Sequence, residues 1–250
     1  MKYVRILRRD TPVWGVLKGE TVRTLSAAPY ESIQYDGESL PLSSCRLLAP
    51  CEPTKIVCIG KNYFDHVKEM GGEAPAKPLL FIKAPNTLNH PEGQVHAPAF
   101  VERLDYEGEL ALVIKKRAKD VAPEHFEEYV LGYTCLNDVT ARDIQYGDGQ
   151  WTRGKSMDGF APVGPLVTDE IDGACADVET RLNGEVVQKG NTELFMHKLP
   201  ELIAFITASM TLEPGDVVTT GTPAGVGPMK PGDTVEVEIR GIGVLRNHIV

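Results

Sequence analysis

The sequence predicts a β-rich α+β protein. Three observations favour this class: short apolar segments recur along the chain, helical periodicity is rare, and Pro-Gly-Asp turns at 214–216 and 231–233 each precede an apolar strand. Short apolar or alternating segments bounded by turn residues are typical of strands, and Pro, Gly and Asp favour the turns that join them. The strands expected after residue 53 are 55–60, 79–82, 109–114, 130–136, 163–167, 217–220 and, as the last strand, 235–239.

The first 52 residues are expected to form a small N-terminal β-rich subdomain. Short apolar segments at 3–7, 13–17 and 21–25 alternate with polar turns. After Pro53 the chain changes to the segment 55–60, which is apolar after Lys55. Because 250 residues lie near the upper size of one compact domain, we expect one main domain, residues 53–250, with this subdomain attached.

Helical spacing is found in two places. His66 and Glu69 stand three residues apart and would share one face of a helix. Near the C-terminus, Pro200 suits the first turn of a second helix. The apolar residues that fall on one face of this second helix are Leu199, Leu202, Ile203, Ile206 and Met210.

The composition excludes several classes of partner. The formal net charge is −9 at pH 7 and the isoelectric point is about 5.2, whereas nucleic-acid binding needs clustered Lys and Arg. Arg5 interrupts the apolar start, which therefore lacks the core of a signal peptide, and no segment approaches the roughly 18 apolar residues of a membrane span. We expect a cytoplasmic protein without nucleic-acid or membrane partners. Five cysteines without a C-x-x-C pair agree with structural thiols in a reducing compartment.

Two acidic side chains stand out in the segment 105–114. If this segment is one strand, Glu107 and Glu109 point to the same face. The residues that follow are apolar on both faces, so the two carboxylates would stand at the entrance of a buried strand. They could also form only the solvated acidic face of an amphipathic strand. Buried neighbouring carboxylates need a cation or a proton, and ligand sets made only of oxygen favour Mg²⁺, Mn²⁺ or Ca²⁺ over zinc.

A third carboxylate follows the apolar strand 130–136. Asp138 could complete the set of metal ligands, or it could cap the next short helix, as aspartate often does. The spacing alone leaves both interpretations open.

Five sequence blocks follow one another along the chain. They are Gly60-Lys61-Asn62-Tyr63 with His66 and Glu69, Asp105-Tyr106-Glu107-Gly108-Glu109, Asn137-Asp138-Val139-Thr140-Ala141-Arg142-Asp143, Gly154-Lys155-Ser156-Met157-Asp158, and Thr220-Gly221-Thr222-Pro223-Ala224-Gly225-Val226-Gly227. Taken together, these blocks resemble the fumarylacetoacetate hydrolase superfamily. The resemblance spans roughly residues 55–250, and the combination of blocks in this order is far more specific than any single one. It implies a mixed β-roll core with a catalytic domain at 53–250, a homodimer as the usual smallest assembly, and Mg²⁺, or Mn²⁺ as a substitute, held by Glu107, Glu109 and Asp138.

The resemblance also implies three catalytic residues. Lys155, which in an unrelated sequence would be a solvated surface charge, is expected to reach the metal site and offset the carboxylates. His66 and Glu69 are expected to activate a water molecule from a mobile lid, whose flank is the segment 70–78. Without the resemblance they would be an exposed pair on a helix.

Substrate contacts are expected from two other blocks. The resemblance places Thr222 near the carboxylate of the substrate, although a Gly-rich block is more often only a tight turn. It also suggests that Arg142 and Gln145 line the pocket. The segment 146–153, which includes Trp151, has no pattern that assigns a role, and we expect it to influence substrate choice.

These features predict an enzyme that acts on a small 2-oxo acid. The expected reaction is Mg²⁺-dependent hydrolysis of a carbon–carbon bond in an acylpyruvate-type acid through a metal-stabilised enolate, because His66 and Glu69 could activate water. Decarboxylation of an oxaloacetate-type acid, or isomerisation or tautomerisation of a hydroxymuconate-type diacid, would use the same site. The run 155–165 favours the isomerase branch. A non-catalytic metal-binding scaffold is the remaining alternative.

Overall fold

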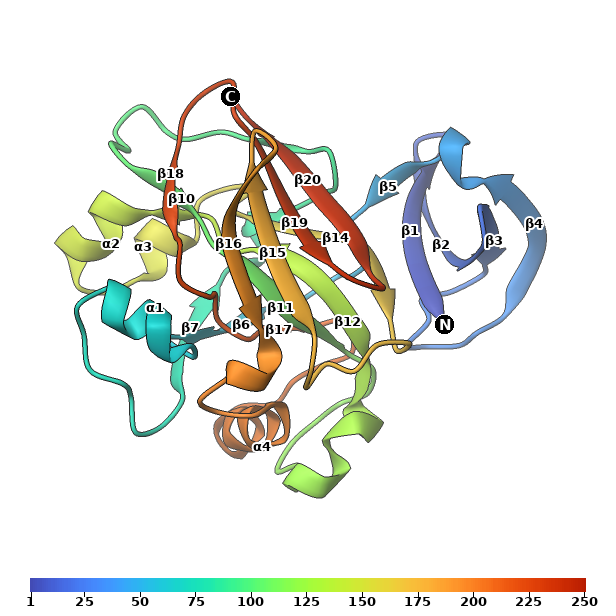
Figure 1. Ribbon diagram of the computed structural model, residues 1–250. Coiled ribbons are helices and arrows are strands. Elements are labelled where there is room, and N and C mark those ends of the chain that lie inside the picture. The colour runs from blue at the N-terminus through green and yellow to red at the C-terminus, as the bar shows by residue number, and fades with distance from the viewer.

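Three β-sheets make up most of the fold, and helices are few (Figure 1). The computed structural model describes residues 1–250. The predicted β-rich α+β class is confirmed, and the sheets are mixed. Most neighbouring strands are antiparallel, but β6 (Ile56–Gly60) and β17 (Val217–Thr219) run parallel. No helix is both long enough and apolar enough to cross a membrane.

The largest sheet has twelve strands. Ten of them follow the order β4-β3-β2-β1-β14-β12-β11-β17-β6-β7, while β5 pairs with β1 and β8 pairs with β14. The bounds are β1 (Lys2–Arg8), β2 (Thr11–Lys18), β3 (Thr21–Leu25), β4 (Tyr35–Pro41), β5 (Arg46–Leu48), β6 (Ile56–Gly60), β7 (Leu79–Lys83), β8 (Leu88–Asn89), β11 (Gly108–Ile114), β12 (Val130–Asn137), β14 (Ala161–Thr168) and β17 (Val217–Thr219).

Two smaller sheets and the helices complete the fold. The five-stranded sheet runs in the order β16-β15-β19-β20-β9 and the three-stranded sheet in the order β13-β10-β18. Their bounds are β9 (Gln94–Val95), β10 (Leu104–Tyr106), β13 (Thr140–Ala141), β15 (Asp177–Leu182), β16 (Glu185–Asn191), β18 (Gly227–Met229), β19 (Thr234–Ile239) and β20 (Gly243–Ile249). The helices are α1 (Phe64–Glu69), α2 (Arg142–Asp148), α3 (Thr152–Lys155) and α4 (Leu199–Ser209), with short 3-10 turns at η1 (Leu42–Ser44), η2 (Pro85–Thr87), η3 (Pro123–Tyr129) and η4 (Thr192–Leu194).

Strand β11 lies at the centre of the largest sheet, and all of its residues are buried. One of its faces packs with α4 through Leu112 and Ile114, while Leu110 packs with residues of the five-stranded sheet. Because β11 is antiparallel to β12 and β17, and β17 is parallel to β6, the start of β11 lies near the ends of β12 and β6. Residues next to these three strand ends therefore meet at one edge of the sheet.

Three details differ from the sequence-based expectation. The segment 105–114 is two strands, β10 and β11, which belong to different sheets, and Glu107 lies at their junction. Strand β19 is not the last strand, since β20 follows it. Met210 lies just beyond α4 and is only half-buried. The other apolar residues expected on that helix are buried as predicted.

The first five strands extend the largest sheet instead of forming one of their own. Strand β1 pairs with β14, with Lys2 opposite Thr168 and Tyr3 opposite Val167. Figure 1 shows β1–β5 on the opposite side of the molecule from α1, α2 and α3. A subdomain of residues 1–52 that folds separately stays a prediction.

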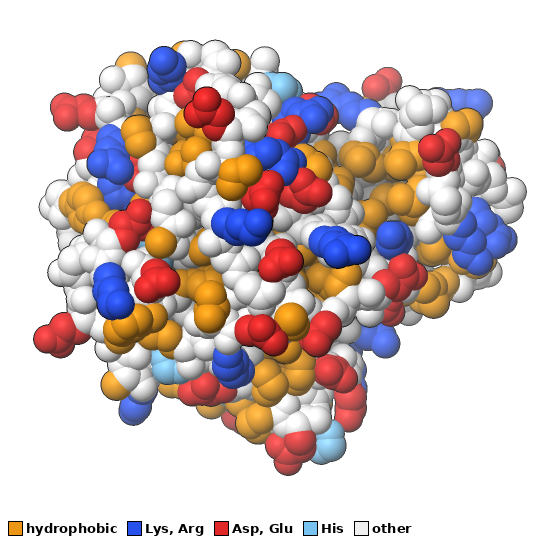
Figure 2. Space-filling model, in the orientation of Figure 1, with side chains coloured by type: hydrophobic (Ala, Val, Ile, Leu, Met, Phe, Trp, Pro, Cys, Tyr) orange, Lys and Arg blue, Asp and Glu red, His pale blue; other side chains and the backbone are white.

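The surface and the cysteines agree with the composition. Figure 2 shows Lys and Arg interspersed with Asp and Glu over the visible face. All five cysteines are free thiols, and Cys51, Cys58 and Cys135 are buried. Burial raises the pKa of the Cys51 thiol to about 12, which keeps it protonated and unreactive.

Gly108 is required where β11 crosses the five-stranded sheet. A Cβ atom at this position would overlap Oγ1 of Thr180 on β15 and lie 3.3 Å from the Val237 side chain on β19. Gly108→Ala should therefore lower the free energy of unfolding by about 1–3 kcal/mol, the usual cost of overpacking a core. The midpoint of urea denaturation measures this loss.

Gly147→Ala is the matched control for this substitution. Gly147 lies in α2, and an added Cβ there meets no atom within 4 Å. Because alanine favours a helix more than glycine does, this variant should be as stable as the wild type or more stable. Equal stability of both variants would mean that the two sheets do not approach closely at Gly108.

Candidate active site

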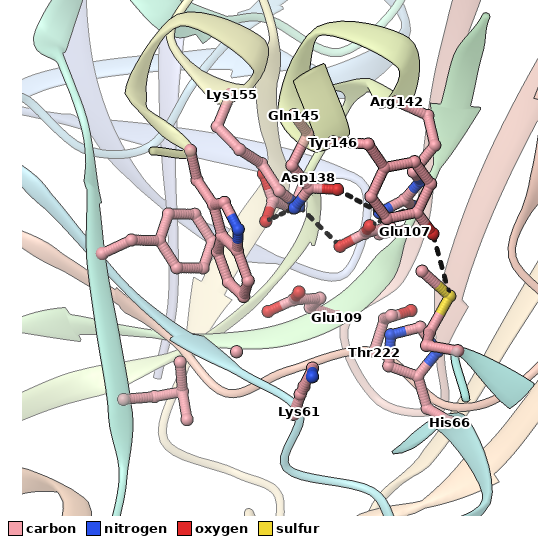
Figure 3. A pocket seen from close by; sticks show the side chains of 15 residues that line it. Lys61, His66, Glu107, Glu109, Asp138, Arg142, Gln145, Tyr146, Lys155 and Thr222 are labelled. Carbon is pink, nitrogen blue, oxygen red and sulfur yellow. Dashed lines mark hydrogen bonds and ion pairs between the residues drawn. The ribbon is translucent and has the colours of Figure 1, made fainter. Parts of the chain in front are cut away.

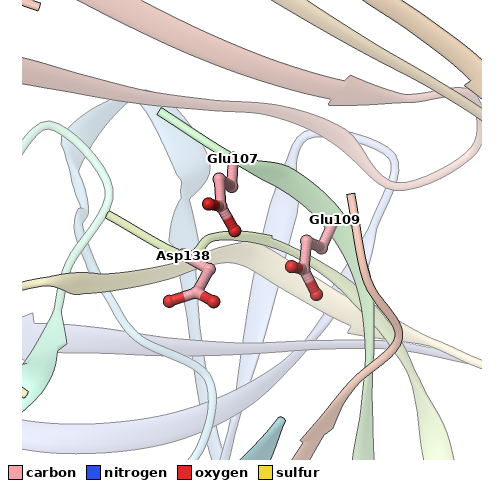
Figure 4. Close-up of side chains that lie close together, drawn as sticks. All are labelled: Glu107, Glu109 and Asp138. Carbon is pink, nitrogen blue, oxygen red and sulfur yellow. The ribbon is translucent and has the colours of Figure 1, made fainter. Parts of the chain in front are cut away.

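Three buried carboxylates converge at the edge where β6, β11 and β12 meet. One carboxylate oxygen each of Glu107, Glu109 and Asp138 lies within 4.8 Å of the other two (Figure 4), and the three residues are at most 5% exposed. Glu109 belongs to β11, and Asp138 directly follows β12. The convergence that the sequence predicted is therefore present, although Glu107 precedes β11 and is not part of it.

Backbone hydrogen bonds hold this carboxylate cluster in place. The amide of Asp138 donates to the carbonyl of Glu107 at 2.8 Å, and the amide of Glu107 donates to Oδ1 of Asn137 at 3.0 Å. From the Gly-rich block, the amide of Gly221 donates to Oε2 of Glu109 at 2.8 Å. Three separate chain segments thus fix the three carboxylates.

Asp138 does not cap a helix. The N-cap position of α2 is Ala141, which has no side-chain capping bond. Instead, Oδ2 of Asp138 lies 2.7 Å from Nζ of Lys155, and its Oδ1 lies 2.6 Å from Nζ of Lys83. The capping interpretation is wrong, and Asp138 belongs to the carboxylate cluster.

Two buried lysines balance the carboxylates. Lys155 bridges Glu107 and Asp138 through N–O distances of 2.8 and 2.7 Å (Figure 3). Lys83, which is fully buried, donates to Asp138 and to the carbonyl of Val139 at 2.9 Å. Lys155 reaches the cluster as expected from the sequence, but Lys83 was missed, because a lysine at the end of an apolar strand ordinarily reaches solvent.

The two lysines differ in electrostatic environment. Burial disfavours the charge of Lys155, but the carboxylates of Asp138 and Glu107 outweigh this effect and raise its pKa. Burial lowers the pKa of Lys83 below its usual value, because Asp138 offsets the lost hydration only in part and the charge of Lys155 lies nearby.

Arg142 is tied to the protein by three groups. Its Nε lies 2.9 Å from Oδ2 of Asp105, its Nη2 lies 2.5 Å from Oε1 of Glu107, and its Nη1 lies 2.7 Å from Oε1 of Gln145. Both Arg142 and Gln145 line the cavity described below. The guanidinium therefore serves at least to orient Glu107, and a direct contact of either residue with a substrate stays a prediction.

The carboxylates titrate very differently. Burial opposes ionisation of Glu107, but Lys155 and Arg142 outweigh it and hold the pKa of Glu107 well below its usual range. Burial raises the pKa of Glu109 to about 8, and the charges of Asp138 and Glu107 add to this effect. Glu109 therefore retains a proton near neutral pH unless a cation replaces it.

The cluster fits a hard divalent cation. Its donors are carboxylate oxygens from three residues, with no cysteine or histidine in the group, and such donors suit Mg²⁺ or Mn²⁺. A carboxylate oxygen that accepts one hydrogen bond still has a lone pair for a cation. The ligands would come from Glu107, Glu109 and Asp138. Such an ion would also stabilise the ionised form of Glu109, which burial and the neighbouring carboxylates disfavour.

His66 and Glu69 lie on α1 and form a pair as expected. Nδ1 of His66 is 3.1 Å from Oε2 of Glu69, whose Oε1 accepts a hydrogen bond of 2.9 Å from the amide of Gly225. His66 is buried and lines the cavity, whereas Glu69 supports it from behind. The expectation of an exposed pair is therefore wrong for His66, whereas Glu69 is exposed.

Thr222 lines the cavity, but its hydroxyl is already engaged. It donates to the carbonyl of Gly108 at 2.9 Å and accepts from Nε2 of Gln188 at 2.8 Å. These bonds attach the Gly-rich block to β11. A contact between Thr222 and a substrate stays a prediction.

Most of these groups line one cavity of about 240 Å³, although Lys83 and Glu69 stand behind its lining. Roughly 300–1,000 Å³ is typical of pockets for drug-sized ligands, so this cavity suits a small molecule. One wall is apolar, because the Trp151 and Phe81 rings pack edge to face at 5.2 Å. The lining residues that sequence reasoning singled out are His66, Glu107, Glu109, Asp138, Arg142, Gln145, Lys155 and Thr222; those that it did not assign are Ile59, Gly60, Lys61, Met70, Phe81, Tyr146 and Trp151.

One residue of the sequence, Gly60, indicates part of the apolar wall of the cavity. Trp151 lies in the segment that had no assigned pattern, and it packs against Gly60, where a Cβ atom would lie 2.7 Å from its ring. A glycine at the end of an apolar strand is consistent with such a close approach, but the sequence did not indicate which residue approaches it.

Comparisons with known proteins agree with this geometry. Residues 55–250 match the family described as fumarylacetoacetate (FAA) hydrolase C-terminal, and residues 1–50 match the one described as Rv2993c-like, N-terminal. The chain belongs to the fumarylacetoacetate hydrolase family. The resemblance inferred from the five sequence blocks is thereby confirmed.

Three relatives of this fumarylacetoacetate hydrolase family member are informative. Protein Rv2993c of Mycobacterium tuberculosis is 44% identical and the match covers 100% of this chain and 98% of that protein. Oxaloacetate tautomerase YisK of Bacillus subtilis is 42% identical over 83% of this chain and 74% of its own length. The crystal structure of a 2-hydroxyhepta-2,4-diene-1,7-dioate isomerase from Mycobacterium marinum has a TM-score of 0.93 and 41% identity, and the match covers 100% of this chain and 98% of that one.

The raised pKa of Glu109 predicts that Mg²⁺ binding releases a proton. At pH 7, below the pKa of about 8, the metal-free protein carries a proton that must leave before the carboxylate binds a cation. The apparent affinity should therefore rise by up to about tenfold per pH unit as the pH increases towards 8, and should level off above it. Calorimetric titration in buffers of different ionisation enthalpy counts the released protons.

Glu109→Gln is the matched variant for this prediction. Glutamine has the size and neutrality of the protonated side chain, so no proton has to leave. The variant should bind Mg²⁺ about tenfold more weakly or worse, since hard cations depend on ligand charge, and without proton release. Wild-type affinity and proton release in this variant would place Glu109 outside the metal site.

Proposed function

We propose that this enzyme moves a proton at the carbon next to the keto group of a small 2-oxo dicarboxylic acid, which interconverts its keto and enol forms. Oxaloacetate is the simplest such substrate. The proposal rests chiefly on one observation: the His66–Glu69 pair and the carboxylate cluster line or support the same small cavity. An acid–base group thus lies in the same cavity as a site for charge stabilisation.

The proton-transfer role of His66 follows from its hydrogen bond. A carboxylate only accepts hydrogen bonds, so Nδ1 of His66 carries the proton that is donated to Glu69. Nε2 then has a free lone pair, and it makes no hydrogen bond within the protein. Nε2 can remove a proton from the carbon and return it to carbon or to the neighbouring oxygen, and Glu69 stabilises the imidazolium formed in between.

The cluster on the other side of the cavity stabilises developing negative charge. Mg²⁺ bound by Glu107, Glu109 and Asp138 would polarise the keto group and stabilise charge on its oxygen. Lys155 contributes a positive charge at the same place, and Arg142 keeps Glu107 oriented. Because these groups are buried, their electrostatic effect is stronger than it would be in water.

Two of the relatives favour proton transfer, although another structural relative, with 38% identity and a TM-score of 0.89, is named a fumarylacetoacetate hydrolase. One is named an oxaloacetate tautomerase and another a dienedioate isomerase. Both names describe proton movement in a dicarboxylic acid, which is the alternative function considered from the sequence. They also weigh against a non-catalytic scaffold.

Hydrolysis of an acylpyruvate is the second candidate. It is favoured by the same His66–Glu69 pair, since Nε2 could deprotonate a water molecule instead of a carbon. Decarboxylation of an oxaloacetate-type acid would use the same charge-stabilising groups but needs no general base. Steady-state assays on oxaloacetate, acetylpyruvate and a hydroxymuconate analogue, with and without Mg²⁺, distinguish these reactions.

His66→Ala should lower kcat for oxaloacetate tautomerisation by about 10²-fold or more, the usual scale of general acid–base catalysis. The reason is that Nε2 carries the proton between carbon and oxygen. The ultraviolet absorbance of the enol form gives the rate. A wild-type enzyme that cleaves acetylpyruvate much faster than it tautomerises oxaloacetate would favour the second candidate.

His125→Ala is the matched control for His66→Ala. His125 pairs with Glu128 through a Nδ1–Oε1 distance of 3.1 Å, also three residues apart, but this pair is exposed on the surface. Its loss should leave the rate unchanged. If His66→Ala also retains the wild-type rate, the proton-transfer role of His66 is wrong.

A further inference from the structure

Lys61 is the unpaired cation of the cavity. Lys61, Arg142 and Lys155 are the lysines and arginines that line it. Arg142 is bonded to Asp105, Glu107 and Gln145, and Lys155 bridges two carboxylates of the cluster. Lys61 makes no hydrogen bond or ion pair through its side chain, although it directly follows β6 at the edge of the site.

The backbone holds Lys61 in an unusual conformation. Its φ is +56°, a left-handed value that L-residues other than Asn and Asp rarely adopt and that costs free energy. The neighbouring Asn62 is fixed by its side chain, which donates to the carbonyls of His197 and Thr220 at 3.2 and 2.9 Å and accepts from the amide of His197 at 2.9 Å. These bonds impose the turn, and Figure 3 shows the Lys61 nitrogen directed towards the side of the cavity where Glu109 lies.

The expected lid flank leaves room for the Lys61 ammonium. A Cβ atom at Gly72 would lie 2.8 Å from Nζ of Lys61, so this glycine lets the segment after α1 pass closely over the charge. Lys61, which is half-buried, therefore lies between the end of β6 and the segment that carries Gly72. A charge held in this way without a protein partner is available to an anionic ligand.

We infer that Lys61 binds the second carboxylate of the substrate and thereby selects dicarboxylic over monocarboxylic 2-oxo acids. This inference rests on the proposed function, in which the 2-oxo acid end lies against the carboxylate cluster. The cation site is taken up by the 2-oxo acid end, and the wall of Trp151, Phe81 and Ile59 is apolar and offers no charge to the second carboxylate. Lys61 offers it three N–H donors and a positive charge.

The test compares two substrates that differ only in the second carboxylate. In Lys61→Met, kcat/KM for oxaloacetate should fall about ten- to hundredfold, the scale of a lost hydrogen bond between charged groups. The rate of proton exchange of pyruvate, measured as deuterium incorporation, should change by less than about threefold. Lys61→Arg should retain most of the preference for the diacid, because it keeps the charge. A parallel loss with both substrates, or no loss with either, would overturn the inference.

Lys77→Met, in the segment that carries Gly72, is the matched control. Lys77 is exposed and does not line the cavity, so removing its charge should alter neither rate. If Lys77→Met lowers the rate with oxaloacetate as much as Lys61→Met does, the loss comes from the change in net charge of the protein, and the assignment to Lys61 is wrong.

A binding measurement separates this inference from the proposed reaction. Malate and lactate are a stable diacid and monoacid that also differ by one carboxylate, and calorimetry in the presence of Mg²⁺ gives their dissociation constants. The wild type should bind malate about tenfold more tightly or better, and Lys61→Met should lose this preference. If wild type exchanges no proton but shows the Lys61-dependent preference, the proposed reaction fails and the role of Lys61 stands. Equal binding of both acids by the wild type, or a preference that survives in Lys61→Met, overturns the role of Lys61.

Discussion

Burial of three carboxylates side by side is the constraint on which the site depends. Like charges within 4.8 Å of one another, removed from water, would destabilise the fold if nothing compensated them. The chain compensates with Lys83, Lys155 and Arg142, with backbone amides, and with a proton retained on Glu109. Among the three carboxylates, Glu109 is the least compensated by positive charge, so a cation bound at the cluster would stabilise it most.

The sheet topology explains why such distant residues meet. The ends of β6 and β12 and the start of β11 share one edge, so short segments after or before these strands deliver Lys61, Asp138 and Glu107 to one place. The acid–base pair comes from a different kind of element, the short helix α1. The proposed charge stabilisation is therefore built on strands, whereas the proposed proton transfer is built on a short helix that precedes residues 70–78.

The sequence predicted the carboxylates better than the cations. Glu107, Glu109 and Asp138 could be recognised because acidic residues beside buried strands are unusual and occur in blocks that resemble a known family. The boundary between β10 and β11 at Glu107 was not predicted, because the sequence of residues 105–114 reads as one strand. Only the pairing of β10 with the distant strands β13 and β18 places it in another sheet. Neither Lys83 nor Lys61 was assigned a role. Lys83 is recognised only by its partner Asp138, which lies more than 50 residues away in the sequence. Lys61 is recognised only because its side chain has no partner within the protein.

The central claim is that the cluster of Glu107, Glu109 and Asp138 binds a divalent cation. Crystals grown with Mn²⁺ and measured at a wavelength where manganese scatters anomalously test it most directly. The account predicts one strong anomalous peak per chain, with an oxygen of each of the three residues within about 2.0–2.6 Å of it. A well-ordered site without a peak between these carboxylates, or with manganese bound only elsewhere, would contradict it.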